Sequence, residues 1–138
     1  MKFLIAVLIL IVSAAMVKSI DPEEKKKMMM ESIAACKAST GASDDDIAKL
    51  MLHKKPEAKE GKCMFNCFME KMGMLKEGKM NKDGLVAWGK SMNAADDLVG
   101  KIISECEEVS DPDACESGIN VGFCLKTTAM KHKLKMEF

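Results

Sequence analysis

The sequence has no tyrosine, a single tryptophan and only two histidines among its 138 residues. It also lacks the alternation of apolar and polar residues that marks half-buried β-strands, and its β-branched residues are not clustered. No grouping of a nucleophile with a general base is apparent. These absences argue against a β-sheet protein and against an enzyme.

An excess of charge of either sign is also lacking, because 21 basic residues balance 21 acidic ones. Residues 1–19 contain two lysines and no acid, so the remainder carries 19 basic against 21 acidic residues, a net charge of −2. A near-neutral surface of mixed sign suggests neither a nucleic acid nor an anionic membrane as partner. About 119 residues are enough for one domain with one core.

Only one long apolar run is present, at residues 3–12, and it directly follows a lysine. Ten residues are too few to span a bilayer comfortably, and small residues follow the run, as in a secretory signal peptide. We predict cleavage after Ser19, with cleavage after Ala15 as the alternative; a retained anchor is the competing interpretation. The prediction is therefore a signal peptide at residues 1–19 and a secreted, extracellular domain at residues 20–138.

Six cysteines follow the predicted signal peptide, separated by 26, 3, 38, 8 and 8 residues: Cys36, Cys63, Cys67, Cys106, Cys115 and Cys124. An even number of cysteines in an exported chain predicts disulfides, here three of them. With all cysteines paired and two histidines left, no zinc site is expected, and no cofactor either.

The spacing of apolar residues is helical throughout the rest of the chain, which predicts an all-α fold with six helices. We expect the first from Asp21-Pro22 to about Ser39, a short second capped by Ser43, a third through Cys63 and Cys67 ending near Gly73 to Gly78, a fourth capped by Asp83, a fifth from about Ala95, and a sixth that starts at Asp111-Pro112 and passes Cys124.

Helix geometry limits which cysteines can pair. Cys63 and Cys67 lie one turn apart on one helix face, too far apart to bridge each other comfortably. Cys115 and Cys124 are nine residues apart, about two and a half turns, so they project from opposite sides of the last helix. Each pair should therefore reach two different partners. This argument leaves several interlocked pairings open.

This cysteine spacing in a secreted helical chain closely resembles that of the insect odorant-binding proteins of the pheromone and general odorant class. The resemblance covers the whole predicted domain, and its tightest parts are the intervals of three and eight residues. It implies a single domain of six helices around an internal apolar cavity. It also implies three interlocked disulfides, Cys36–Cys67, Cys63–Cys115 and Cys106–Cys124.

A carrier for apolar molecules needs a cavity lined by aliphatic, aromatic and thioether groups. We expect the lining to come from inward-facing residues and from positions that resemble cavity-lining ones in the family. These are Met29, Ile33, Phe65, Phe68, Met69, Met72, Leu85, Trp88, Met92, Val99, Ile103, Phe123 and Leu125. Any one of them could instead be plain core, since apolar helical stripes usually are.

The resemblance implies an extracellular carrier that binds and solubilises small hydrophobic molecules, odorants or pheromones, and takes part in olfaction. A carrier or scavenger of the same fold outside the sense organs is the alternative, followed by a disulfide-stapled effector, for which the near-zero charge is unsuitable. The expected partner is a small apolar ligand, without nucleic acid or membrane insertion, and the expected state is a monomer or weak homodimer. A membrane odorant receptor as a further partner does not follow from the residues.

Three remaining features have both a structural and a functional interpretation. His53 and His132 could make ligand release depend on pH, but each is expected to be a solvated surface residue. The tail at residues 127–138 could fold over the cavity or fray at the chain end.

Overall fold

The computed structural model describes residues 21–134. The predicted signal peptide, both of its cleavage sites and the last four residues of the tail lie outside the described residues. The chain divides into two compact units, Met1–Glu31 and Ser32–Phe138.

The described part of the first unit, residues 21–31, is the exposed beginning of helix α2 (Pro22–Thr40). As expected from the Asp-Pro sequence, the Asp21 side chain accepts a hydrogen bond from the Glu23 backbone N–H at 3.3 Å. Lys27 and Glu31 lie one turn apart with their charged atoms 3.9 Å from each other, on the exposed surface of this helix.

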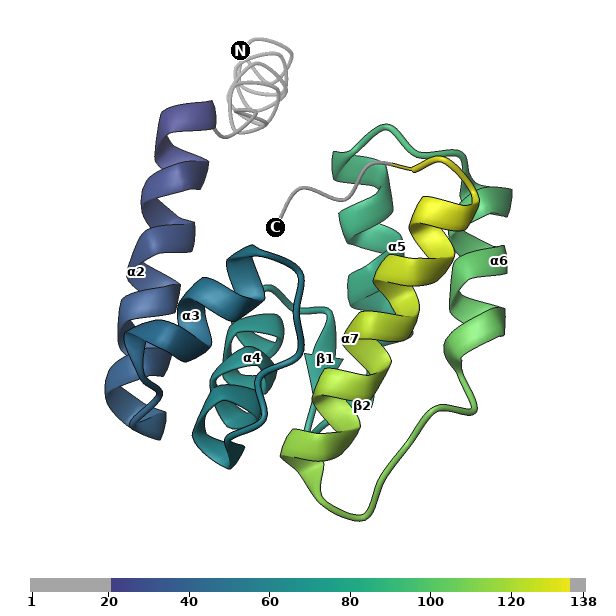
Figure 1. The fold of residues 1–138 in the computed structure, drawn as a ribbon. Helices are drawn as coiled ribbons and strands as arrows, with labels where there is room; N and C mark the ends of the chain where they lie inside the picture. The colour runs from purple at the N-terminus through teal and green to yellow at the C-terminus, as the bar shows by residue number, and fades with distance from the viewer. Residues whose placement is uncertain (1–20, 135–138) are drawn as a thin grey trace, which may run out of the picture. The chain divides into compact units, whose positions relative to one another are not determined.

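Six helices and one short hairpin make up the described residues, in the order drawn in Figure 1. After α2 come α3 (Asp44–Met51), α4 (Lys59–Lys71), β1 (Leu75–Lys76), β2 (Lys79–Met80), α5 (Lys82–Ser91), α6 (Asp96–Cys106) and α7 (Ala114–Lys131). The predicted all-α class with six helices is confirmed for this part of the chain. Among the described residues, no helix is long and apolar enough to cross a membrane.

The predicted cap of α3 at Ser43 is confirmed, and Asp46 completes it. The Ser43 hydroxyl accepts a hydrogen bond from the Asp46 backbone N–H at 3.1 Å, and the Asp46 carboxylate accepts one from the Ser43 backbone N–H at 3.0 Å. This reciprocal pair satisfies two backbone donors at the helix N-terminus. Acidic residues in the first turn add a favourable interaction with the helix dipole.

Two predicted helix starts were wrong. Helix α5 is capped by Asn81 rather than Asp83: the Asn81 Oδ1 accepts from Gly84 N at 3.3 Å, while its Nδ2 donates to Gly73 O at 2.9 Å. An aspartate could not make the second bond, because it has no N–H. Helix α7 begins after Asp113 rather than Asp111. The Asp113 carboxylate accepts hydrogen bonds from the backbone N–H groups of Cys115 and Glu116, which makes it the cap of the helix.

A β-hairpin between α4 and α5 was not predicted. Its strands pair Leu75 with Met80 and Lys76 with Lys79, and the turn residues Glu77 and Gly78 have φ angles of 53° and 74°. Positive φ angles at both turn residues match the twist of a hairpin with a two-residue turn. The hairpin was not predicted because strands of two residues are too short to show an alternation of apolar and polar residues. Helix α4 correspondingly ends at Lys71, slightly before the predicted region.

The three disulfides confirm the pairing implied by the family resemblance. Cys36–Cys67 joins α2 to α4, Cys63–Cys115 joins α4 to α7, and Cys106–Cys124 joins α6 to α7. Cys63 and Cys67 thus reach different helices, as do Cys115 and Cys124, in agreement with the geometric argument. Helices α3 and α5 contain no cysteine, so packing, hydrogen bonds and ion pairs hold them in place of a disulfide.

The core lies where α4 and α7 pack together, the most extensive helix contact among the described elements. Met69 on α4 and Ile119, Val121 and Leu125 on α7 are completely buried. The two helices approach closely because α7 has a glycine at residue 122, where the Phe65 ring of α4 occupies the space that a side chain would need.

Candidate ligand-binding site

Helix α5 contributes one apolar face to the candidate site. Leu85, Trp88 and Gly89 follow the i, i+3, i+4 spacing that places residues on the same side of a helix. Leu85 is buried, Trp88 is half-buried, and Gly89 is buried against α6. The indole of Trp88 therefore has one part in the core and another near solvent, a position that suits a reporter of bound molecules.

Helix α6 has the same spacing at Val99, Ile102 and Ile103, all of which are buried. These three residues, Leu85 and Trp88 of α5 and the fully buried Leu125 of α7 surround a small cavity. Its wall is entirely apolar. Its volume is about 10 Å³, close to the minimum that one water molecule needs.

The structure brings five of the thirteen predicted ligand contacts together around this cavity: Leu85, Trp88, Val99, Ile103 and Leu125. The sixth lining residue, Ile102, was not among the predicted contacts. Its spacing from Val99 and Ile103 was a usable signal, because these positions share one helix face. Whether any of these residues touches a ligand stays a prediction.

The other eight predicted contacts are placed elsewhere. The rings of Phe65 on α4 and Phe123 on α7 lie 6.0 Å apart between their centroids, and the Lys55 ammonium lies 5.4 Å above the Phe123 ring. Phe68 and Met69 are buried in α4, and Met72 and Met92 are half-buried at helix ends. On α2, Met29 and Ile33 are half-buried. Their role as contacts likewise stays a prediction.

A buried cation, Lys126 of α7, was not predicted from the sequence, because lysine is rarely buried. Its residue is 8% exposed, and this burial lowers the pKa of the Lys126 ammonium. The Nζ atom contacts Nδ1 of His53, which follows α3 in a left-handed conformation with φ 62°. His53 is exposed, as expected, but it has this contact with the interior.

The second histidine, His132, is also more than a solvated residue. Its Nε2 lies 2.8 Å from the Glu105 Oε1, and Lys131 Nζ lies 3.2 Å from the other oxygen of the same carboxylate. Hydrogen bonds from His132 and from Lys131, in that order of strength, lower the pKa of Glu105. These contacts fix the end of α7 to α6.

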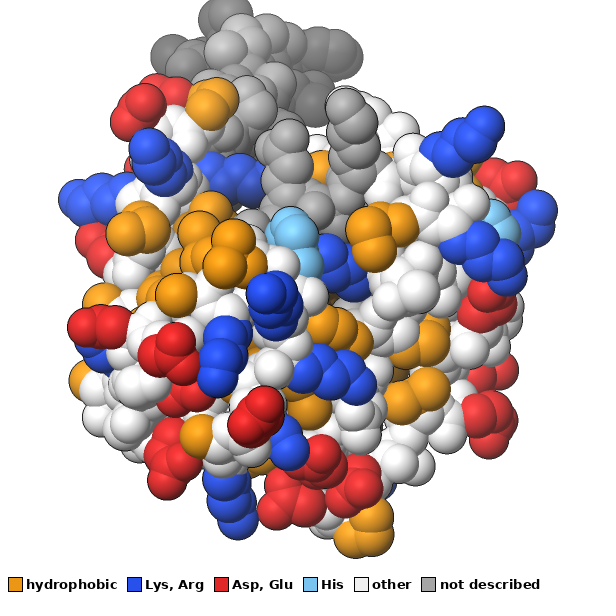
Figure 2. All heavy atoms as spheres, in the orientation of Figure 1, with side chains coloured by type: hydrophobic (Ala, Val, Ile, Leu, Met, Phe, Trp, Pro, Cys, Tyr) orange, Lys and Arg blue, Asp and Glu red, His pale blue; other side chains and the backbone are white. Residues whose placement is uncertain are grey.

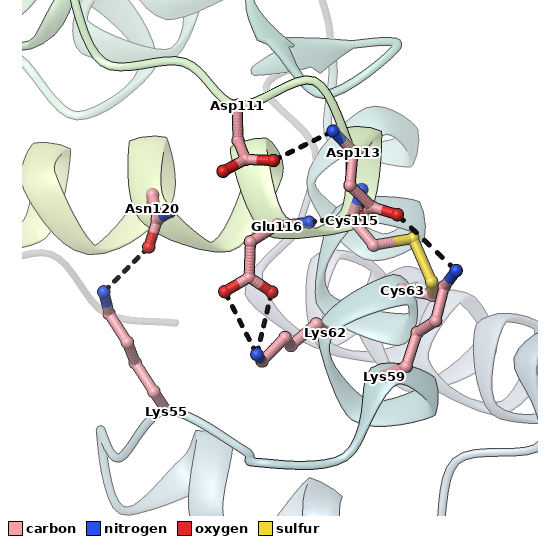
Figure 3. Close-up of polar contacts among 9 residues, drawn as sticks. All are labelled: Lys55, Lys59, Lys62, Cys63, Asp111, Asp113, Cys115, Glu116 and Asn120. Atoms are coloured by element: carbon pink, nitrogen blue, oxygen red, sulfur yellow. Dashed lines mark hydrogen bonds and ion pairs between the residues drawn. A yellow bond between two sulfur atoms is a disulfide. The ribbon is translucent and has the colours of Figure 1, made fainter.

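Two lysines of α4 face the beginning of α7 (Figure 3). Lys59 lies 3.5 Å from the Asp113 carboxylate, and Lys62 lies 2.7 Å from that of Glu116. The backbone hydrogen bond from Glu116 is the largest of the effects that lower the pKa of Asp113. The contacts surround the Cys63–Cys115 disulfide, and we interpret them as structural because every charge in them has a partner.

The outer surface has the mixed charge expected from the composition. On the face shown in Figure 2, basic and acidic side chains alternate with small groups of hydrophobic side chains. Among the described residues, no group of histidine, cysteine, aspartate and glutamate side chains could hold a metal ion. The candidate site is the apolar cavity between α5, α6 and α7.

Comparison with known proteins identifies the family. The model of the PBP/GOBP family matches residues 18–128, which is most of the chain. This chain belongs to the PBP/GOBP family. The proposed resemblance to pheromone and general odorant-binding proteins is confirmed, and so are its fold and its three disulfides.

Several odorant-binding proteins are similar to this PBP/GOBP chain. General odorant-binding protein 19d of Drosophila melanogaster is 34% identical over 108 residues, which cover 74% of this chain and 72% of the relative. The structure of odorant-binding protein dmelOBP28a from Drosophila melanogaster is 27% identical with a TM-score of 0.67, and the match covers 83% of this chain and all of that one.

A third relative is known with a bound molecule. Odorant-binding protein 7 from Anopheles gambiae, with four disulfide bridges and in complex with an azo compound, is 25% identical with a TM-score of 0.59. The match covers 86% of this PBP/GOBP chain and all of that one. These relatives are odorant-binding proteins, which agrees with the expectation that the chain is a carrier rather than an enzyme.

Proposed function

We propose that this protein, with residues 1–19 removed as a signal peptide, is an extracellular carrier that binds and solubilises small hydrophobic molecules such as odorants or pheromones. The observation that carries the proposal is the apolar cavity between α5, α6 and α7 in a chain of the PBP/GOBP family. An interior without polar groups suits a molecule that gains by leaving water. The azo compound bound by the Anopheles relative supports this ligand class.

The cavity must expand to accept such a molecule. Pockets for small organic ligands measure about 300–1,000 Å³, whereas the space between these helices is about 10 Å³. The side chains and at least one helix of the site therefore shift on binding. Burial of apolar area contributes about 25 cal/mol per Å², so a ligand of a dozen carbons can reach about −8 kcal/mol, or micromolar affinity, after the ordering costs.

We propose the five predicted residues around the cavity, together with Ile102, as the first contacts of the ligand. The remaining candidates are contacts only if the expanded cavity reaches them: Met29, Ile33, Phe65, Phe68, Met69, Met72, Met92 and Phe123. This division follows from which residues line the described cavity, and it separates the candidates experimentally.

A fluorescence experiment tests the proposal. Because Trp88 is the only tryptophan, its emission reports directly on the cavity wall. We expect an aliphatic alcohol or ester to change this emission in a saturable way and to displace the apolar probe N-phenyl-1-naphthylamine. A charged polar solute of similar size should do neither. Saturable binding of the polar solute, or no probe binding at any concentration, would rule out the proposed function.

A further inference from the structure

We propose that helix α5 is the moving wall of the site, which turns outward about its N-terminal end to admit a ligand while α6 and α7 stay fixed. The inference rests on the proposed function and adds to it the element that moves. It starts from the cavity volume of about 10 Å³, which is too small for an organic ligand unless one of the three surrounding helices shifts.

The disulfides distinguish α5 from the other two walls. Cys106–Cys124 joins α6 to α7 covalently, with 5.8 Å between the two Cα atoms. Cys63–Cys115 joins α7 in turn to α4. Separation of α6 from α7 is therefore opposed by a covalent bond. Helix α5 contains no cysteine, and of the two helices without one, only α5 contributes residues to the cavity.

The polar contacts of α5 lie at its first turn. The cap residue Asn81 bonds both to Gly84 N and to Gly73 O, and the Lys82 ammonium lies 2.7 Å from the Glu107 carboxylate that follows α6. These contacts hold the N-terminal end of α5 to the hairpin side and to the end of α6. Because these contacts hold only the first turn, we expect α5 to turn about its N-terminal end.

The C-terminal part of α5 has no such contact within the described part of the chain. The Ser91 hydroxyl donates to Trp88 O of the same helix, and no hydrogen bond or ion pair connects a side chain of residues 85–91 to another element. Beyond the cap Met92, Asn93 has a φ angle of 54°, and the connection reaches α6 at Asp96. Among residues 21–134, apolar packing alone holds this end in place.

The decisive packing contact is that of Gly89 with Val99. A Cβ atom added at residue 89 would lie 3.5 Å from the Val99 Cβ and 2.5 Å from its Cγ2. The backbone of α5 thus rests directly on a side chain that lines the cavity. When α5 turns outward, this contact opens first, together with the contacts of Leu85 and Trp88.

The same geometry provides a lock. A Cβ–Cβ distance of 3.5 Å is suitable for a disulfide. The double variant Gly89→Cys/Val99→Cys should therefore form a bridge that ties the C-terminal end of α5 to α6. The matched control is Gly89→Ser/Val99→Ser, whose side chains have nearly the same size but form no bond. Peptide mapping of the unreduced protein checks that the new bridge is present and the three native bridges are unchanged.

The measurement is the association rate of N-phenyl-1-naphthylamine by stopped-flow fluorescence. We expect the bridged variant to bind about tenfold more slowly than the serine control, because binding that requires a conformational change becomes slower when this change is blocked. Equal rates would overturn the proposal, and would point to movement of α5 and α6 together. If the serine control and the unaltered protein do not bind the probe at all, the proposed function itself fails.

Hydrogen exchange of the unaltered protein provides a test without any substitution. Amides of residues 85–91 should exchange at least about tenfold faster than those of residues 119–129 in the core of α7, and the probe should slow the former selectively. If both segments exchange equally slowly, α5 does not open, whether or not the engineered bridge forms.

Discussion

Gly122 of α7 lies directly against the Phe65 ring of α4: a Cβ atom at residue 122 would be 2.2 Å from the ring's Cε1 and 2.4 Å from its Cζ. Non-bonded carbon atoms do not approach so closely, so a side chain at residue 122 would have to displace the ring. The contact therefore allows the two helices at the centre of the core to pack at a distance that only glycine permits.

Replacement of this glycine should destabilise the protein. We expect Gly122→Ala to lower the free energy of unfolding by about 1–3 kcal/mol, because the Phe65 ring must leave its position in a packed contact. The control is Gly100→Ala, at an exposed site of α6 where a Cβ would meet no atom within 4 Å. That change should stabilise the protein by about 0.5–1 kcal/mol, through helix propensity.

Urea unfolding with the disulfides intact gives both values. A Gly122→Ala variant as stable as the unaltered protein would mean that the two helices separate at little cost. The close approach would then not be a constraint on the fold.

The disulfides should differ in their contribution to stability. Cys63–Cys115 closes a loop of 52 residues and Cys106–Cys124 one of 18. From the loop-closure entropy of the unfolded chain, we expect losses of about 4 and about 3 kcal/mol when each pair is changed to serine. Thermal unfolding of the two double variants measures the order. The opposite order would show that native-state contacts, such as the lysine–acid pairs in Figure 3, compensate for the longer loop.

The helices, and the cysteine pairs to be disfavoured, could be predicted from the sequence because both follow from spacing. Ser43 and Asp46 are three residues apart, as a capping box requires, and the interval between Cys63 and Cys67 disfavours a bond between them. The pairing itself needed the family resemblance. Geometry alone left several interlocked arrangements open.

Other features depend on contacts between residues distant in sequence. Asn81 caps α5 because its amide also reaches Gly73 O, a bond that appears only when the hairpin has formed. The burial of Lys126 depends on how α7 packs, and no local pattern of residues indicates it. The small volume of the cavity depends on the distance between α5 and α6, which the glycine at residue 89 sets, and apolar periodicity contains no information about it.

The carboxylate of Glu105 should make stability depend on pH at the acidic end. Its pKa is lowered from the usual 4.5 by the hydrogen bonds from His132 and Lys131. A group whose pKa is lower in the folded state stabilises the protein above its unfolded pKa, and this stabilisation is lost as the pH falls through the folded pKa. The melting temperature of the unaltered protein should therefore fall more steeply below about pH 4.5 than that of Glu105→Gln.

The control for this measurement is Glu77→Gln. Glu77 is an exposed residue of the hairpin turn with no ion pair among the described residues, so its replacement should leave the pH profile unchanged. High salt should reduce the difference between Glu105→Gln and the unaltered protein, because both partners are partly exposed. Parallel pH profiles for Glu105→Gln and the unaltered protein would contradict the prediction.

The length of the preferred ligand should follow the size of the side chains around the cavity. In a homologous series of aliphatic alcohols, each added methylene should strengthen binding by at most about 0.8 kcal/mol until the expanded cavity is full. Ile102→Ala removes three carbon atoms from the wall, so the longest alcohol that still gains affinity should increase by about two or three carbons. Val86→Ala, on the exposed side of α5, is the control and should not move this limit.

Salt should have little effect on any of these affinities, since the lining contains no charged group. Displacement titrations at low and high salt measure both quantities. A limit that stays at the same chain length in Ile102→Ala would place the ligand outside the α5–α6–α7 cavity. An affinity that collapses at high salt would instead indicate an ionic contact, for which the buried Lys126 would be the first residue to examine.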